Sequence, residues 1–232
     1  MQVVYLHGFA SSPHSSKATF LERKLTDRGI PVTIPDLNQP DFSTLTVSRM
    51  LGWVAESIAA STEPISVVGS SLGGFVAVQA ARLHPDRISR VVLLAPALDF
   101  DGNRLSDLGD RGLEAWRASN TLGVFHYGYG RMMPVHYELY ADARRYNAIQ
   151  AQISQPVQVF QGRFDTAVNP ETVEQWARSR PNVELHMLDD DHQLLKSLEG
   201  IWAEMERFLT NKSLGSDQES PRDSPSLGPD RR

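Results

Sequence analysis

Residues Ile65-Ser66-Val67-Val68-Gly69-Ser70-Ser71-Leu72-Gly73 pass from an apolar stretch into a glycine-bracketed turn, and a helical pattern follows over Phe75–Leu83. This order predicts a strand, a sharp turn and a helix, with Ser71 at the apex. Gly69 and Gly73 suit a turn in which side chains would collide with the backbone of the neighbouring strand and helix. A G-x-S-x-G turn of this kind lifts a serine hydroxyl above the sheet as a nucleophile. The alternative is a glycine-rich turn needed only for close packing.

The composition limits the class of protein. The chain has 232 residues, of which 41% are hydrophobic and 22% charged, with a net charge of −5 and no cysteine. This size fits one domain over residues 1–210 followed by a short tail. The acidic balance argues against nucleic-acid binding. Without cysteine there is no disulfide, no thiolate metal site and no cysteine nucleophile.

The start of the chain and its apolar runs bear on location. A strand pattern begins directly after Met1-Gln2, so we expect no signal peptide. No apolar run reaches the ~18 residues needed to span a bilayer. We therefore expect a cytoplasmic protein without a membrane span, and its oligomeric state is not predicted.

Short apolar runs alternate with longer amphipathic ones along the chain. The patterns predict strands near residues 2–6, 31–34, 64–68, 90–95, 156–161 and 183–188, and helices near 15–28, 44–61, 73–84, 170–179 and 193–210. Strands separated by helices pair in parallel through right-handed crossovers. We therefore expect an α/β fold: a doubly wound, mostly parallel sheet of about six strands with helices on both faces. Its ligands would bind beyond the C-terminal ends of the strands.

Two segments depart from this alternation. Residues 99–150 form a long insertion, which we interpret as a helical cap over the C-terminal edge of the sheet. Residues 211–232 are rich in Ser, Asp and Pro and are predicted to be a disordered tail. Five of the six tyrosines fall in the cap, where they either line a pocket or attach the cap to the core: Tyr127, Tyr129, Tyr137, Tyr140 and Tyr146.

A serine hydroxyl needs a base to act as a nucleophile near neutral pH. His192 is the best-placed histidine, because it follows the last strand at the edge where Ser71 also lies and is expected to open the last helix. Other positions have simpler explanations: a helix end, a strand, the cap or a serine-rich loop. These competing histidines are His84, His186, His126, His136 and His14.

Asp165 is the expected acid that orients His192, since it follows the strand near 156–161 and reaches the same edge. Asp99, just past the preceding strand, is its rival. Asp189-Asp190-Asp191 is too close to His192 in sequence to reach its far nitrogen easily, and we expect it to solvate a turn. Neighbours in sequence rarely converge on one ion, so we expect no metal here.

Attack on a carbonyl also requires donors for the developing negative charge. One is expected to be the backbone N–H of Leu72, directly after the nucleophile. The second is expected from the loop His7-Gly8-Phe9-Ala10 after the first strand, with the Phe9 N–H preferred and the Ala10 N–H next.

The chain order Ser71, Asp165, His192, with His-Gly after an early strand and Gly-x-x-Asp after a late one, resembles the α/β-hydrolase fold superfamily. Two stretches more specifically resemble the small bacterial YqiA-like esterases. They are Tyr5–Pro13 (YLHGFASSP), followed by Ser16-Lys17-Ala18, and Gly69–Gly74 (GSSLGG).

The resemblance covers roughly residues 2–210, and the match to the narrower family is concentrated in the first 100. It implies a serine esterase or thioesterase that uses no cofactor, with Ser71, Asp165 and His192 as its triad. Unlike larger hydrolases, the chain begins directly in the His-Gly strand. The cap carries no motif that matches, so the resemblance implies no particular substrate.

The expected activity is hydrolysis of a small-molecule carboxylic ester or thioester through an acyl-enzyme on Ser71. The aromatic content of the cap favours an apolar acyl group. Carbon–carbon bond hydrolysis, amidase or peptidase action and perhydrolysis use the same serine and stay open, because a fold does not fix a function. A non-catalytic ligand-binding protein is the other class, although all three members of the triad are present.

Overall fold

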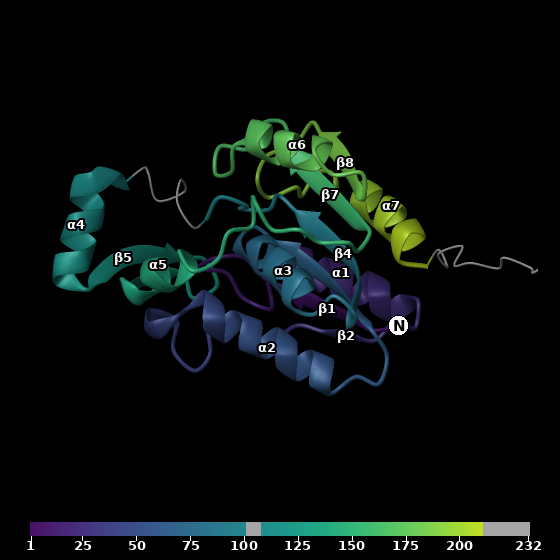
Figure 1. The fold of residues 1–232 in the computed structure, drawn as a ribbon, viewed down its shortest axis with the longest axis horizontal. Helices are drawn as coiled ribbons and strands as arrows, with labels where there is room; N and C mark the ends of the chain where they lie inside the picture. The colour runs from purple at the N-terminus through teal and green to yellow at the C-terminus, as the bar shows by residue number, and fades with distance from the viewer. Residues whose placement is uncertain (101–107, 211–232) are drawn as a thin grey trace, which may run out of the picture.

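A six-stranded sheet forms the centre of the computed structural model, which describes residues 1–100 and 108–210 (Figure 1). The predicted tail 211–232 and residues 101–107 of the predicted cap lie outside the described residues. The strands are β1 (Val3–Leu6), β2 (Val32–Thr33), β3 (Ile65–Ser70), β4 (Ile88–Leu94), β7 (Val157–Gly162) and β8 (Val183–Leu188). They pair in parallel in the order β2-β1-β3-β4-β7-β8, which confirms the predicted sheet.

Helices cover both faces of this sheet. Helices α1 (Ser16–Asp27) and α7 (Leu198–Thr210) share one core with Val3 and Tyr5 of β1. The opposite core holds Val4 and Leu6 of the same strand, packed with α2 (Val47–Ala59), α3 (Leu72–Leu83) and α6 (Pro170–Arg178). Successive strand residues point to opposite faces, so a strand covered on both sides must be apolar throughout.

The ends of the helices follow local sequence signals, with one exception. Asn169 accepts a hydrogen bond from the Glu171 N–H at 2.9 Å and precedes Pro170 at the first position of α6, as expected. The last helix begins at Leu198 instead of near 193, so His192 does not open it. Leu194 adopts a φ of +56°, which interrupts a right-handed helix and leaves a loop before α7.

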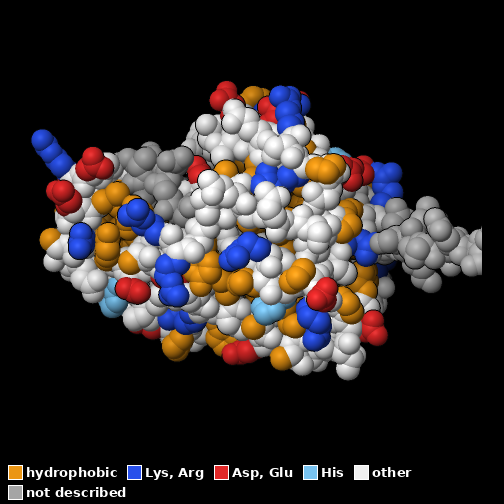
Figure 2. Space-filling view, in the orientation of Figure 1, with side chains coloured by type: hydrophobic (Ala, Val, Ile, Leu, Met, Phe, Trp, Pro, Cys, Tyr) orange, Lys and Arg blue, Asp and Glu red, His pale blue; other side chains and the backbone are white. Residues whose placement is uncertain are grey.

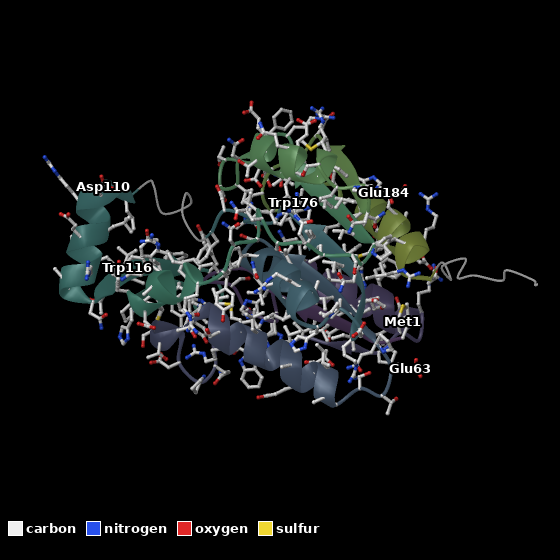
Figure 3. All side chains as sticks on the ribbon, in the orientation of Figure 1. Met1, Glu63, Asp110, Trp116, Trp176 and Glu184 are labelled. Atoms are coloured by element: carbon white, nitrogen blue, oxygen red, sulfur yellow. The ribbon has the colours of Figure 1, made fainter. Side chains whose placement is uncertain are left out.

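The insertion contains a β-hairpin as well as helices. It comprises α4 (Gly109–Ser119), β5 (Thr121–His126), β6 (Arg131–His136) and α5 (Glu138–Ala143), and β5 and β6 pair antiparallel. The hairpin was not expected from the sequence. In Figure 3, Asp110 and Trp116 mark the cap at the end of the molecule opposite Met1 and Glu63, which precede β1 and β3. The cap therefore lies beyond the C-terminal ends of the strands, as predicted.

Polar and aromatic contacts attach the cap to the core. The buried carboxylate of Asp142 accepts hydrogen bonds from the Ser48 N–H at 2.7 Å and from the Ser48 Oγ at 2.6 Å. Trp116 is buried in the cap, with two tyrosine rings against it. Tyr137 and Tyr140 contact Trp116 within the cap and also pack in the hydrophobic cluster that holds α2 and α3, and Tyr146 is hydrogen-bonded to Ser48 of α2. These three of the five cap tyrosines attach the cap to the core.

Among residues 1–100 and 108–210, no helix is both long enough and apolar enough to cross a membrane. Figure 2 shows Lys and Arg interspersed with Asp and Glu over the face in view.

Candidate active site

Ser71 lies in the tight connection between β3 and α3. Its φ of +53° and ψ of −116° are unusual for a residue with a side chain, a strain that costs ~1–3 kcal/mol. Backbone hydrogen bonds hold it there: its N–H donates to the Leu94 carbonyl at 3.0 Å, and its carbonyl accepts from the N–H groups of Gly74 and Ala97. Strain retained by such bonds is typical of a functional position.

The two glycines of the turn are required by the close approach of backbone. A Cβ at Gly69 would lie 2.3 Å from the Gly73 carbonyl oxygen, and a Cβ at Gly73 would lie 2.1 Å from that of Leu6. These contacts confirm the predicted collisions. A Cβ at Gly8 would lie 3.3 Å from the Ser71 Cβ, which places the loop after β1 directly beside the serine.

His192 and Asp165 are joined by a hydrogen bond. The His192 Nδ1 lies 2.8 Å from the Asp165 Oδ2, and the side chain of Asp165 is fully buried. The Asp165 Oδ1 accepts the N–H groups of Ala167 and Val168, both at 2.8 Å. Gln161 Nε2 donates to the Asp165 Oδ2 at 3.0 Å. Four donors therefore fix the carboxylate.

This arrangement sets the proton positions of the pair. Burial by itself would raise the pKa of Asp165, but the hydrogen bond and charge of His192, helped by the donors of Val168 and Gln161, outweigh it and hold that pKa below its usual value. An ionised carboxylate at Nδ1 requires the proton on that nitrogen. In the neutral ring the His192 Nε2 then carries the lone pair that a base needs.

Asp190 organises the loop that carries His192. It is buried, and its two carboxylate oxygens accept the N–H groups of Asp191 at 2.8 Å and Ser197 at 2.9 Å. A Cβ at Gly162 would lie 2.5 Å from the Asp190 carbonyl oxygen, so only glycine allows the loop after β7 to approach so closely. The prediction that this aspartate run solvates a turn was wrong for Asp190, since its side chain is buried and accepts hydrogen bonds from two backbone N–H groups of the loop.

The rival residues belong to other segments of the chain, and of these His14 also lines the cavity beside Ser71. Asp99 is half-buried, and the His192 Nδ1 is bonded to Asp165 instead. Asp189 forms an ion pair with Arg163, with 3.2 Å between the Asp189 Oδ1 and the Arg163 Nε. The competing histidines occupy the end of α3, strand β8, the hairpin and the serine-rich loop: His84, His186, His126, His136 and His14.

A cavity of about 1150 Å³ lies beside Ser71 and His192, and both residues line it. Part of its wall is rich in hydroxyl groups, from Ser11 to Ser16. Another part is aromatic and comes from the hairpin: Phe125, Tyr127 and Tyr129. The cap tyrosines therefore divide between the two roles considered, and two of the five line the cavity.

The expected oxyanion donors lie at this site. Leu72 begins α3 directly after Ser71, and Phe9 follows Gly8 and lines the cavity. Within the described part of the chain, neither the Leu72 N–H nor the Phe9 N–H has a hydrogen-bond acceptor. The choice between the N–H groups of Phe9 and Ala10 stays a prediction.

Sequence reasoning missed three polar residues at the site. Gln161 donates to Asp165, Tyr5 lies fully buried at the cavity wall, and Lys17 reaches the loop of His192. Burial raises the pKa of the Tyr5 hydroxyl, so this group stays protonated. Tyr5 and Lys17 had a sequence signal, because both belong to the stretches that carry the family resemblance, whereas Gln161 had none.

In the described residues, one group of three side chains could hold a metal ion: Glu184, His186 and Glu204. Glu184 lies near the start of β8, far from the cap in Figure 3. Glu204 already pairs with Arg207, and the Glu184 Oε1 lies 3.0 Å from the His186 Nε2. The candidate catalytic residues are not part of this group.

Two known enzymes are similar to this chain in sequence. Lipase LipV of Mycobacterium tuberculosis is 34% identical over 86 residues, which are 35% of this chain and 33% of the lipase. The match therefore spans about a third of that enzyme. Pimeloyl-acyl-carrier protein methyl ester esterase of Methylococcus capsulatus is 29% identical over 227 residues, covering 82% of this chain and 86% of the esterase.

Solved structures share the fold. Est1E from Butyrivibrio proteoclasticus with bound ferulic acid has a TM-score of 0.77 at 19% identity, covering 90% of this chain and 88% of Est1E. The monoacylglycerol lipase of Paleococcus ferrophilus has a TM-score of 0.73 at 17% identity, covering 90% and 93%. These likenesses establish the α/β-hydrolase fold. Residues 2–210 match the family described as "Uncharacterised protein family (UPF0227)", and this chain belongs to that family.

Proposed function

We propose that this protein hydrolyses carboxylic esters or thioesters through an acyl-enzyme formed on Ser71. The observation that carries the proposal is the 2.8 Å hydrogen bond between the His192 Nδ1 and the Asp165 Oδ2, formed beside a cavity that Ser71 also lines. An esterase and a lipase among the similar proteins support the same reaction class.

The first half of the reaction acylates the enzyme. Ser71 Oγ attacks the carbonyl carbon while its proton passes to the His192 Nε2, and the carbonyl electron pair moves to oxygen. The backbone N–H groups of Leu72 and Phe9 stabilise this oxyanion. The tetrahedral intermediate then expels the alcohol or thiol, which takes the proton from His192 and leaves the acyl group on Ser71.

The second half releases the acid. Water attacks the acyl carbon and gives a proton to the His192 Nε2. The second intermediate then breaks its bond to the Ser71 Oγ, which recovers the proton. Asp165 stays ionised throughout and stabilises the imidazolium that forms in each half. All groups used are side chains and amides of this chain, so no cofactor enters the scheme.

The residues that line the cavity favour a substrate with one apolar part and one polar part. The aromatic side chains of Phe125, Tyr127 and Tyr129 suit an apolar part, because they offer large flat surfaces. The hydroxyl-rich wall from Ser11 to Ser16 suits a polar part. A small ester with one apolar and one polar end fits both walls, which refines the expectation of an apolar acyl group. The cytoplasmic location stays a prediction.

Replacing the nucleophile tests the proposal. We expect Ser71→Ala to abolish hydrolysis of short p-nitrophenyl esters, a loss of ~10⁶-fold in kcat on the scale of other serine hydrolases. Hydrolysis is followed by release of p-nitrophenolate, and folding by circular dichroism.

Ser66→Ala is the matched control, since Ser66 is a buried serine near the start of β3, the strand that leads into Ser71. Its activity should stay close to that of the wild type. If Ser71→Ala kept wild-type turnover, the serine mechanism would be wrong. A wild type inert toward esters but active on amides would replace ester hydrolysis by amide hydrolysis, in which the leaving group is an amine.

A further inference from the structure

Lys17 occupies an unusual place for a lysine. It lies in the first turn of α1, only 7% of its surface is exposed, and it lines the cavity that Ser71 and His192 share. Its ammonium donates a hydrogen bond to the backbone carbonyl of His192, with 3.2 Å between the Lys17 Nζ and the oxygen. The side chain therefore joins the start of α1 to the loop that carries His192.

This position is costly for a cation. Burial lowers the pKa of Lys17 to about 8, against the favourable influence of the carboxylates of Asp165, Asp191 and Asp190. The start of a helix also carries the positive end of its dipole, which disfavours a lysine there. An apolar side chain would avoid both costs, so packing alone does not explain a lysine at position 17.

The surroundings of the ammonium indicate what it does. The charged groups that influence it come from two loops: Asp165 after β7, and Asp190 and Asp191 after β8. The other titratable groups on the cavity wall are Tyr5, His14, Asp36, Tyr127, Tyr129 and His192. Three carboxylates near one cation leave the region negative. A negatively charged part of a substrate would therefore be repelled here, which argues against Lys17 as an anion-binding residue.

We propose that Lys17 is a positioning residue for the reaction under "Proposed function", on which this inference rests. Its hydrogen bond fixes the backbone at His192. Its positive charge compensates the negative charges of the nearby carboxylates of Asp165, Asp190 and Asp191. Without the ammonium, Asp165, Asp190 and Asp191 repel one another, and His192 loses its alignment between Ser71 and Asp165. The same uncompensated charge also makes it easier to protonate the imidazole in the resting enzyme.

Three variants test this role: Lys17→Met removes donor and charge, Lys17→Arg keeps both, and Lys24→Met is the control. Lys24 lies on the same helix and also bridges to α7, with 2.7 Å between the Lys24 Nζ and the Glu199 Oε2, but it does not line the cavity. The measurements are kcat and KM for p-nitrophenyl esters, and the pH profile of kcat/KM.

For Lys17→Met we expect kcat to fall ~10–10²-fold, the scale of a misplaced catalytic group, with KM within about threefold of the wild type. The acid limb of the kcat/KM profile should move to higher pH, because that limb reports protonation of the base in the free enzyme. Lys17→Arg should recover much of kcat and return the limb toward its wild-type position. Lys24→Met should match the wild type.

Other results would overturn the role. If Lys17→Met has the kcat of the wild type and the acid limb of its kcat/KM profile does not move, Lys17 does not position His192. A higher KM for an anionic ester alone would make Lys17 a substrate-binding residue. A lower kcat with an unmoved limb and no recovery in Lys17→Arg would indicate a packing role only. If Lys17→Met does not fold, Lys17→Gln replaces it, and the same movement of the acid limb is expected because the charge is gone.

The two proposals fail separately. A folded wild type that hydrolyses no ester and leaves Ser71 unlabelled by a fluorophosphonate probe contradicts the proposed function. If the wild type hydrolyses esters and is labelled at Ser71, and Lys17→Met has the same kcat and pH profile, only the role of Lys17 is contradicted.

Discussion

The turn that carries Ser71 and the loop that carries His192 lie at the same edge of the sheet but are built differently. The turn is held by backbone, through the Ser71 N–H to the Leu94 carbonyl and the close contacts of two glycines. The loop is held by its own Asp190 and by two side chains from distant parts of the chain, Asp165 and Lys17.

This difference has consequences for substitution and for pH. A backbone-built turn tolerates almost no added atom, and it contains no titratable group of its own. A loop held by carboxylates and an ammonium can keep its fold while losing alignment, and it responds to pH. We therefore expect substitutions of the turn glycines to lower the free energy of unfolding. Substitutions of the side chains that hold the loop should lower kcat instead.

The largest effect is expected from Gly73→Ala. Its Cβ would lie 2.1 Å from the Leu6 carbonyl oxygen, so β1 and α3 must separate. We expect a loss of at least ~4 kcal/mol in the free energy of unfolding, or no folded protein at all. The free energy of unfolding is measured by urea denaturation of the variant and the wild type.

Gly52→Ala is the control for this change. Gly52 lies inside α2 with no atom within 4 Å of an added Cβ, so alanine there should stabilise the protein by ~0.5–1 kcal/mol. A Gly73→Ala protein as stable as the wild type would show that the turn is not closed by this contact.

Asp165→Asn should leave the fold and lower the rate. The N–H groups of Ala167 and Val168 keep an oxygen at the Oδ1 position, so the new amide nitrogen must face the His192 Nδ1. A donor there forces the proton onto Nε2, and the base is lost. We expect kcat for p-nitrophenyl esters to fall ~10⁴-fold.

Asp99→Asn gives the matched comparison, since Asp99 was the rival from the sequence. We expect its kcat to stay near that of the wild type. The reverse outcome, with Asp99→Asn inactive and Asp165→Asn active, would give the orienting role to Asp99.

The smallest effect concerns the pH dependence of stability. Burial lowers the pKa of Lys17 from 10.5 to about 8, so between these values the unfolded chain holds a proton that the folded chain has released. The free energy of unfolding of the wild type should therefore rise relative to that of Lys17→Met, by ~2 kcal/mol between about pH 8 and pH 10. Urea unfolding at several pH values measures this gap, and a gap that stays constant would contradict the buried ammonium.

Much of this molecule could be predicted from local sequence signals. The parallel sheet follows from apolar strand patterns separated by helices, and the turn at Ser71 follows from two glycines four residues apart. The positions of Asp165 and His192 follow from strand ends, because the C-terminal ends of parallel strands meet at one edge.

The rest depends on contacts that a single sequence does not reveal. The hairpin formed by β5 and β6 was missed, because its strands carry glycine and proline in place of a clear alternating pattern. The late start of α7 depends on the Ser197 N–H, which donates to the buried Asp190. Gln161 has no signal at all, since its donor function exists only where β7 meets Asp165.

The central claim is that Ser71, His192 and Asp165 act as one unit. Its most direct test is the rate at which a fluorophosphonate probe labels the wild type and His192→Ala, with the modified peptide identified by mass spectrometry. We expect labelling of the wild type at Ser71, and a rate lower by at least ~10³-fold in His192→Ala. Labelling at another serine, or an equal rate in both proteins, would contradict the account.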